Sequence, residues 1–359
     1  MKLRSTLSLL FVSVFSIFFI HPISAQTKLK IEVDERVELL TTIQLLSGYQ
    51  WLTEAQLNYK LEVSKSFQSF DKHPAITLYK RLSEQFYGYN PLLFLMHYQL
   101  PNFNQIAEFT EEDKLELNLA KDKDSLELFL KLAKQFYISS HFHSFYLKHQ
   151  DFYKSIIKPI ETESNLHDYI GKMEKYYGQK QASYHVILSP LQMDAGFGPM
   201  IRNKQGLNLY SIVGPKGDSY LIPDFDKDYL FQELILHEFS HSFCNPIIDS
   251  FYQQLSLDSC LYDTIQKAMT RRGYPNWKSC LYEHFTRANE IVLTSIIFDH
   301  PTAALRLKNE IEKEHFIYLE KMVTTIMQNY SSHNPSLTSV MPLIIRYLDG
   351  EKERCSSHK

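Results

Sequence analysis

The chain is short of cysteine, nearly balanced in charge and, after its first residues, without long apolar runs. Its 359 residues include four cysteines, and the formal net charge is −3. This near balance gives no indication of nucleic acid or an anionic membrane surface as a partner. The cysteines lie in the C-terminal third, and their spacing fits no zinc ribbon or finger, so we do not expect them to bind metal. They are Cys244, Cys260, Cys280 and Cys355.

The same cysteines leave the question of disulfides open. An even number permits disulfides in an oxidising compartment. A Cys260–Cys280 bond would link two predicted helices, whereas free buried thiols fit the sequence equally well.

Two common catalytic patterns are missing as well. No serine stands in a nucleophile-elbow context, and no glycine-rich loop is suited to phosphate binding. There is also no internal repeat or low-complexity tract. Aromatic residues, in contrast, are abundant: 24 Phe and 23 Tyr favour a well-packed globular protein over a disordered one.

The N-terminus has the pattern of a secretory signal peptide. Lys2 and Arg4 precede an apolar stretch at 7–20, and Ala25 ends a small-residue cleavage site. The alternative is a transmembrane anchor, for which the apolar stretch is short. We therefore expect residues 1–25 to be removed, which predicts a secreted or periplasmic protein that is not associated with a membrane afterwards.

The periodicity of apolar residues changes along the chain. Residues 34–159 read as helical, with hardly any strand signal. Short strands are predicted at 184–188, 207–213 and 219–222, separated by glycine and proline. Further helices are predicted at 247–256, 259–270, 277–298, 302–328 and 338–347.

These patterns predict an α+β, mostly helical protein. An N-terminal helical region at 26–160 would precede a second region at 161–359, unless 26–359 forms one continuous domain. A small sheet followed by a helix with the motif described next is the order found in zincin catalytic domains. In such folds the edge strand can bind an extended peptide above the metal. The expectation of a peptide-binding edge strand rests on an analogy between folds.

The run His237-Glu238-Phe239-Ser240-His241 is the most informative feature of the chain. On a helix, residues four apart lie on one face, so both imidazoles can reach one metal ion. Glu238 points partly away, where it can meet a water molecule on that ion. This H-E-x-x-H arrangement is that of zinc peptidases. Asp226 and Asp228 are candidate N-caps of the helix, and Asn245-Pro246 is predicted to end it.

A polar helix face that carries two histidines by chance is the alternative. The flanking residues argue against it, because a solvated helix would not carry so many apolar side chains; these are Leu230, Leu234, Ile235, Leu236, Phe239 and Phe243. The histidines are therefore expected to be buried, and buried polar groups need partners.

A catalytic zinc ion needs a third protein ligand and leaves one position for water. In a later predicted helix, Glu283, Arg287 and Glu290 fall on one face, and either glutamate could reach the metal. His284 is a weaker ligand candidate that could instead donate a hydrogen bond to a substrate. The alternative is an exposed Glu–Arg pair, although the apolar neighbours indicate a buried helix.

Two other patterns carry less weight. His141 and His143 resemble a metal pair, with His149 nearby, but residues two apart do not share a helix face, so ordinary packing is expected. Gly196-Phe197-Gly198 is expected to be a plain loop.

Several stretches together resemble a known family. They are 237–243 with Asn245-Pro246, Glu283-His284-x-x-Arg287-Ala288, 33–40, 46–49 and 187–191. With these motifs the chain is similar to a domain-of-unknown-function family of secreted bacterial proteins regarded as zinc metallopeptidases. The resemblance spans nearly the whole mature chain, which argues against independent domains. It implies a gluzincin-like site with Glu283 as third ligand and Arg287 as its partner. Cys244 departs from the aliphatic residue expected there.

Our hypothesis from the sequence is a secreted zinc-dependent peptidase acting on a peptide or protein substrate. His237, His241 and Glu283 would hold zinc, with Glu290 as the alternative third ligand, and Glu238 would act as general base. Candidates for steadying the oxyanion are His284, Arg287, Tyr282 and Tyr274.

Two rival hypotheses belong to other classes. One is a secreted zinc-binding protein without catalysis, whose site is closed by a fourth ligand such as Glu290 or His284. The other is a helical binding protein without any metal. The sequence does not distinguish substrates or oligomeric states.

Overall fold

The structure is a computed structural model that describes residues 28–84, 89–193, 196–216, 222–225, 229–330 and 336–357. The predicted signal peptide and the candidate N-caps Asp226 and Asp228 lie outside these residues. Within the described part of the chain, no helix combines the length and apolar character that crossing a membrane requires.

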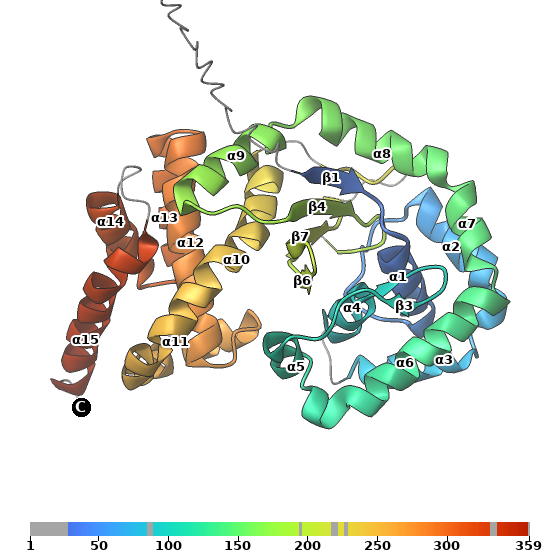
Figure 1. Ribbon diagram of the computed structural model, residues 1–359, viewed down its shortest axis with the longest axis horizontal. Helices are drawn as coiled ribbons and strands as arrows, with labels where there is room; N and C mark the ends of the chain where they lie inside the picture. Colours follow the sequence, from blue (N-terminus) through green and yellow to red (C-terminus); the bar gives the residue numbers. More distant parts are fainter. Residues whose placement is uncertain are drawn as a thin grey trace, which may run out of the picture.

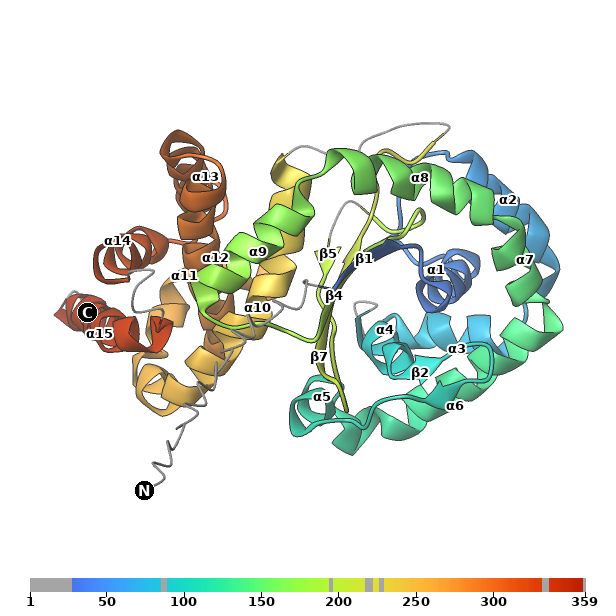
Figure 2. The same ribbon diagram turned by 45° about the horizontal axis from the view of Figure 1, so that its top comes forward.

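The N-terminal region is helical, as predicted. Its helices are α1 (Glu35–Ser47), α2 (Asn58–Phe67), α3 (Pro74–Leu82), α4 (Tyr89–Met96), α5 (Glu111–Glu116), α6 (Leu119–Ser139), α7 (Phe142–Lys148) and α8 (Gln150–Glu163). The first begins where the Asp34 side chain accepts a hydrogen bond from the Arg36 backbone, and it ends at Gly48, whose φ of 76° is left-handed. Figure 2 shows α1 enclosed by the arc that the other helices form.

Three short strands in this region were not predicted from the sequence. β1 (Leu29–Glu32) precedes α1, and β2 (Tyr98–Gln99) pairs with β3 (Asn104–Gln105) in a small hairpin. Runs of two to four residues are too short for an alternation of apolar and polar side chains to be recognised.

The main sheet contains the two longer predicted strands. β4 (Ser183–Leu188) pairs in parallel with β1 on one side and with β7 (Gly206–Val213) on the other. β5 (Gly196–Phe197) and β6 (Met200–Asn203) both pair antiparallel with β7 and form the opposite edge. The expectation of a plain loop at 196–198 is therefore wrong for its first two residues. Of the third predicted strand, only Ile222 is described, and it lies in a bend.

Helices cover both faces of this sheet (Figure 2), which explains why β4 is largely buried on both faces, with only His185 partly exposed. One face packs towards α1, and the other packs towards α10 (Tyr229–Leu255) and α9 (Leu166–Tyr177). Because β1 comes from the N-terminal region and β4 from the C-terminal one, a shared sheet joins the two regions. The fold is α+β and mostly helical, as expected.

The C-terminal helices continue from α10 on the far side of the sheet (Figure 1). They are α11 (Leu261–Arg271), α12 (Trp277–Ile297), α13 (His300–Glu312), α14 (Leu319–Asn329) and α15 (Met341–Ser357). Short 3₁₀ turns occur at Gln68–Phe70, Ser256–Asp258 and Leu337–Val340. α12 lies beside α10 and packs against α13 and α14.

Two predicted helix boundaries in this region are wrong. α10 does not end at Asn245-Pro246 but continues through Pro246 to Leu255. Proline removes one backbone hydrogen bond, yet Phe243 and Ile248 are buried on either side and hold the helix in place. The single helix predicted at 302–328 is two helices, because the chain turns at 313–318 to bury Phe316.

The described cysteines are free thiols. Cys244 and Cys280 are buried and Cys260 is exposed, so the alternative of a Cys260–Cys280 disulfide is wrong. The side chain of Cys355 lies outside the described residues.

Candidate metal centre

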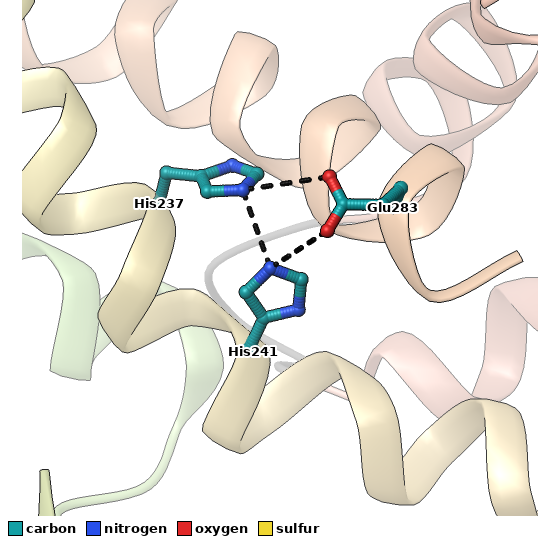
Figure 3. Close-up of side chains that lie close together, drawn as sticks. All are labelled: His237, His241 and Glu283. Carbon is teal, nitrogen blue, oxygen red and sulfur yellow. Dashed lines mark hydrogen bonds and ion pairs between the residues drawn. The ribbon is translucent and has the colours of Figure 1, made fainter. Parts of the chain in front are cut away.

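Two adjacent helices bring three of the predicted site residues together. His237 and His241 project from α10, and Glu283 projects from α12 (Figure 3). The two Nε2 atoms are 3.2 Å apart, and His241 Nε2 lies 3.2 Å from Glu283 Oε1. His237 Nε2 is 3.6 Å from Glu283 Oε2. One ligating atom from each side chain fits within 4.8 Å of the others, a geometry suited to holding one metal ion.

The other ring nitrogens have partners that set the tautomers. His237 Nδ1 lies 2.7 Å from Glu290 Oε2, and His241 Nδ1 lies 3.1 Å from Asn245 Oδ1. Both partners are hydrogen-bond acceptors, so each Nδ1 carries a proton that it donates. When both rings are neutral, as metal binding requires, the Nε2 lone pairs converge on the same point as the Glu283 carboxylate. A carboxylate on the far nitrogen of a histidine is also typical of metal-binding histidines.

The electrostatics of the group match a site for a cation. Burial alone would raise the pKa of Glu283, but the nearby charges of His241 and His237 hold this pKa far below its ordinary value. Burial lowers the pKa of His241, yet Glu283 outweighs burial and raises it to about 9. Glu283 Oε2 is buried and accepts no hydrogen bond from the described residues. The pocket therefore favours positive charge at this point.

Glu290, the alternative third ligand, lies behind His237 and away from the converging Nε2 atoms. Its Oε2 accepts from His237 Nδ1, and its Oε1 accepts from Arg306 Nη2 at 2.9 Å. Burial would raise the pKa of Glu290, but Arg306 and His237 lower it to about 2. The geometry therefore favours Glu283 over Glu290 as the ligand.

A chain of ion pairs leads from Arg306 back to the ligand. Arg306 Nε lies 3.2 Å from Glu310 Oε1, which also pairs with Arg287 Nη1 at 3.1 Å. Arg287 Nε is 3.3 Å from Glu283 Oε2, and its guanidinium lies over the Phe316 ring. Arg287 thus pairs with the candidate ligand Glu283 and with Glu310.

Glu238 lies beside this group, with its carboxylate against two glycines of the sheet edge. A Cβ added to Gly198 would lie 2.5 Å from Glu238 Oε2, and one added to Gly196 would lie 2.9 Å from Oε1. Burial raises the pKa of Glu238 above its ordinary value. Glycine at both positions therefore gives this carboxylate its space.

Three other predicted site residues lie at different distances from the metal group. Tyr274 lies just before α12, close enough to Glu283 and Arg287 that their charges act on the pKa of its phenol. His284 is buried on another side, with Nδ1 at 2.9 Å from the Cys280 carbonyl. Burial lowers the pKa of His284 to about 4. Tyr282 donates to Asp249 near the surface. His284 and Tyr282 are thus not brought to the site.

Of the histidines at 141–149, His149 is packed as expected, whereas His141 is exposed and His143 is partly exposed. His143 bonds to Glu35, and His149 bonds to the Phe145 carbonyl, so each has an ordinary structural partner.

Sequence reasoning missed several residues that support the group. Asn245 was interpreted as part of a helix end, although its position four residues after His241 places it on the same face. Arg306 and Glu310 lie four residues apart on α13 and pair with each other. Nothing in the sequence indicates that this pair contacts α12. Thr286, one turn from Glu283, lies 3.2 Å from His241 Nδ1.

Comparison with known proteins gives one match. A family model described as "Domain of unknown function (DUF4932)" matches residues 29–347. No curated protein and no solved structure shows significant similarity to the chain. The matched stretch contains every residue of the metal group and of its ion pairs. Because it covers most of the chain, the protein belongs to the family described as Domain of unknown function (DUF4932).

Proposed function

We propose that this protein is a secreted zinc-dependent metallopeptidase with a zincin-like, gluzincin-type site. The observation that carries the proposal is the convergence of two imidazole Nε2 atoms and one carboxylate, with a further carboxylate beside them. Two histidines and one glutamate form a ligand set known from catalytic zinc sites, which keep one position open.

The residues present fit zinc. His237 and His241 would offer neutral Nε2 atoms, and Glu283 would offer an ionised oxygen that lacks a hydrogen bond among the described residues. When bound, zinc would supply Lewis acidity that lowers the pKa of a water molecule towards neutrality.

Glu238 would act as the general base. It would take a proton from the attacking water on one carboxylate oxygen and deliver it to the leaving amine. Gly196 and Gly198 leave room for this carboxylate on the side of the sheet, because a side chain at either position would collide with it.

Tyr274 is the better candidate for steadying the oxyanion. Burial, and then Glu283, raise the pKa of its phenol, which therefore keeps its proton at neutral pH and can donate it in a hydrogen bond. Arg287 is committed to Glu283 and Glu310 and would act by positioning the ligand.

The edge formed by β5 and β6 would guide an extended peptide substrate. It is the edge strand nearest Glu238, and strand edges bind extended peptides through backbone hydrogen bonds.

The closed, non-catalytic zinc site is less well supported. It needs a fourth protein ligand, but Glu290 is engaged with His237 Nδ1 and Arg306, and His284 packs against Phe316. Among the described residues, the metal group consists of three side chains.

The test measures zinc content and peptide hydrolysis on the same preparations. Residues 26–359 are purified as wild type, Glu238→Gln and Glu283→Ala. We expect about one zinc per chain in wild type and Glu238→Gln, and hydrolysis of a peptide library by wild type alone. Glu283→Ala should lose the metal.

Each contrary result points elsewhere. Zinc in the wild type without hydrolysis would favour the non-catalytic protein. Absence of zinc after reconstitution would favour the metal-free binding protein. Full activity of Glu238→Gln would remove the mechanism.

A further inference from the structure

The N-terminal region brings a tyrosine up to the candidate general base. The Tyr89 ring, at the start of α4, stacks on Phe197 of β5 with centroids 5.9 Å apart and planes at 27°. Phe197 stands between Gly196 and Gly198, where an added Cβ would collide with the Glu238 carboxylate. The first turn of α4 is thus one side chain away from the metal group, although it lies more than 100 residues earlier in the chain.

This tyrosine lies beside an acidic residue. The phenol of Tyr89 lies near the Glu116 carboxylate at the end of α5, and the charge of Glu116 adds to burial in raising the pKa of the phenol. The neighbouring Asn90 side chain donates to the Glu116 backbone carbonyl at 3.3 Å, which fastens the two helices together. Glu116 is therefore held beside Tyr89 through its backbone.

Glu116 is accessible and close to the site. Its side chain is exposed, yet enough protein surrounds it that burial raises its pKa, while Tyr89 and the charge of His241 lower it. Tyr89 in turn is affected by the charge of Glu238. No cation among the described residues forms an ion pair with Glu116.

The charges of the metal group make Glu116 stand out. With zinc bound, two positive charges of the ion and two guanidiniums balance four carboxylates; these groups are Arg287, Arg306, Glu238, Glu283, Glu290 and Glu310. Glu116 then adds one uncompensated negative charge beside a balanced site. An accessible charge of this kind is best matched by a positive charge that arrives with the substrate.

We propose that Glu116, held beside the start of α4, binds a cationic group of the substrate next to the metal group. This inference rests on the proposed function and names a substrate class, peptides with a positive charge near the scissile bond. The charge can be the amino terminus or a lysine or arginine side chain, and both would bind the carboxylate through the same charge-assisted hydrogen bonds.

Binding is measured by calorimetry on zinc-loaded Glu238→Gln, alone and combined with Glu116→Gln. The probes are three tetrapeptide amides: tetra-alanine with a free amino terminus, its N-acetyl form, and the N-acetyl form with one lysine. We expect Glu116→Gln to weaken cationic probes about tenfold and the neutral probe less than about twofold. Loss for the free amine alone identifies the amino terminus, and loss for lysine alone identifies a side chain.

The matched control is Glu112→Gln, which removes the same charge from an exposed position on α5 and should leave all three affinities unchanged. Tyr89→Phe keeps the stacked ring and should give a smaller loss, confined to the cationic probes. Equal weakening of neutral and cationic probes, no effect of Glu116→Gln, or no binding of any cationic probe would overturn the proposal. Glu116-dependent binding without hydrolysis by the wild type would keep it and refute the peptidase.

Discussion

Two buried glutamates on different sides of the sheet behave in opposite ways. Glu38 on α1 is 0% exposed and Glu283 on α12 is 8% exposed. Burial is the largest influence on both, and it raises the pKa of Glu38 to about 7. The pKa of Glu283 instead falls far below its ordinary value, because His241 and His237 outweigh burial.

The partners explain the difference. Glu38 accepts a hydrogen bond from Tyr59 at 2.6 Å and one from Ser189 at 3.4 Å, both neutral hydroxyls. Such donors stabilise a carboxylate only modestly in an apolar interior. Glu283 faces imidazoles and a guanidinium. A buried acid with neutral partners is a structural element, whereas one surrounded by cations and metal-type donors is a candidate for function.

The largest expected effect is a difference in zinc content between variants of the two glutamates. Glu283→Gln should lose zinc almost completely, because it replaces the ionised ligand by a neutral amide at the same position. Glu38→Gln should retain about one zinc per chain. Metal analysis of both purified variants gives the answer, and loss of zinc from Glu38→Gln would break the comparison.

The next largest effect is expected when the space around the Glu238 carboxylate is reduced. Gly198→Ala would place a Cβ 2.5 Å from Glu238 Oε2 and 3.3 Å from the Glu238 backbone oxygen. The carboxylate must move, so we expect peptide hydrolysis to fall about 100-fold or more with zinc retained. The control is Gly171→Ala, where nothing lies within 4 Å of the added atom. Unchanged hydrolysis in Gly198→Ala would mean that Glu238 does not need its present position.

A smaller effect, on zinc affinity, is expected at Glu290, which lies behind the candidate ligand His237. Glu290→Gln removes the charge that orients His237 through Nδ1, and the zinc dissociation constant should rise about 10- to 100-fold. Competition with a zinc chelator measures it. Glu312→Gln, exposed on the same helix as Arg306, should leave the constant unchanged. Complete loss of zinc in Glu290→Gln would instead favour Glu290 as a direct ligand.

The smallest effect is on stability and appears as a dependence on pH. Because the folded state raises the pKa of Glu38 from 4.5 to about 7, the folded protein binds the proton more tightly than the unfolded chain. The free energy of unfolding therefore falls as pH rises from about 4.5 to about 7, by roughly 3 kcal/mol, and then levels off.

Glu38→Gln should remove this dependence. Its Tm should exceed that of wild type at pH 8, and the difference should shrink towards pH 4.5. Thermal unfolding at both pH values, on zinc-loaded protein, tests this. Glu161→Gln removes the same charge from an exposed position and should show no such pattern. A pH-independent difference for Glu38→Gln would contradict the assigned cause.

Most of the secondary structure followed from local patterns, because helices such as α1 and α12 carry their own caps. Asp34 and Gly48 bound the first, and Asn276 begins the second by accepting from the Ser279 backbone. The end of α10 could not be predicted in this way. Tertiary packing outweighs the local effect of Pro246, and such packing is not visible in a short window of sequence.

In the candidate site, too, some residues could be predicted from local spacing and others only from the fold. The spacing of His237 and His241 places them on one helix face, and Glu283 stood out as an acid in an apolar helix. Their partners come from elsewhere in the chain: Arg306 and Glu310 from α13, and Gly198 from the sheet edge. No periodic pattern links these segments, so only the fold reveals that Glu290 orients a histidine and that His284 lies aside.

The parallel pairing of β1 with β4 has a consequence for synthesis of the chain. Leu29 pairs with Tyr184, so the first strand leaves the ribosome long before its partner exists. At about 5–20 residues per second, the interval is roughly eight to thirty seconds. During that time β1 has an unpaired edge that the helices translated in the meantime cannot complete. The sheet can close only after β4 emerges, and α12, which carries Glu283, follows later still. The proposed metal binding would therefore be one of the last events in folding, because a chain halted before α12 lacks Glu283.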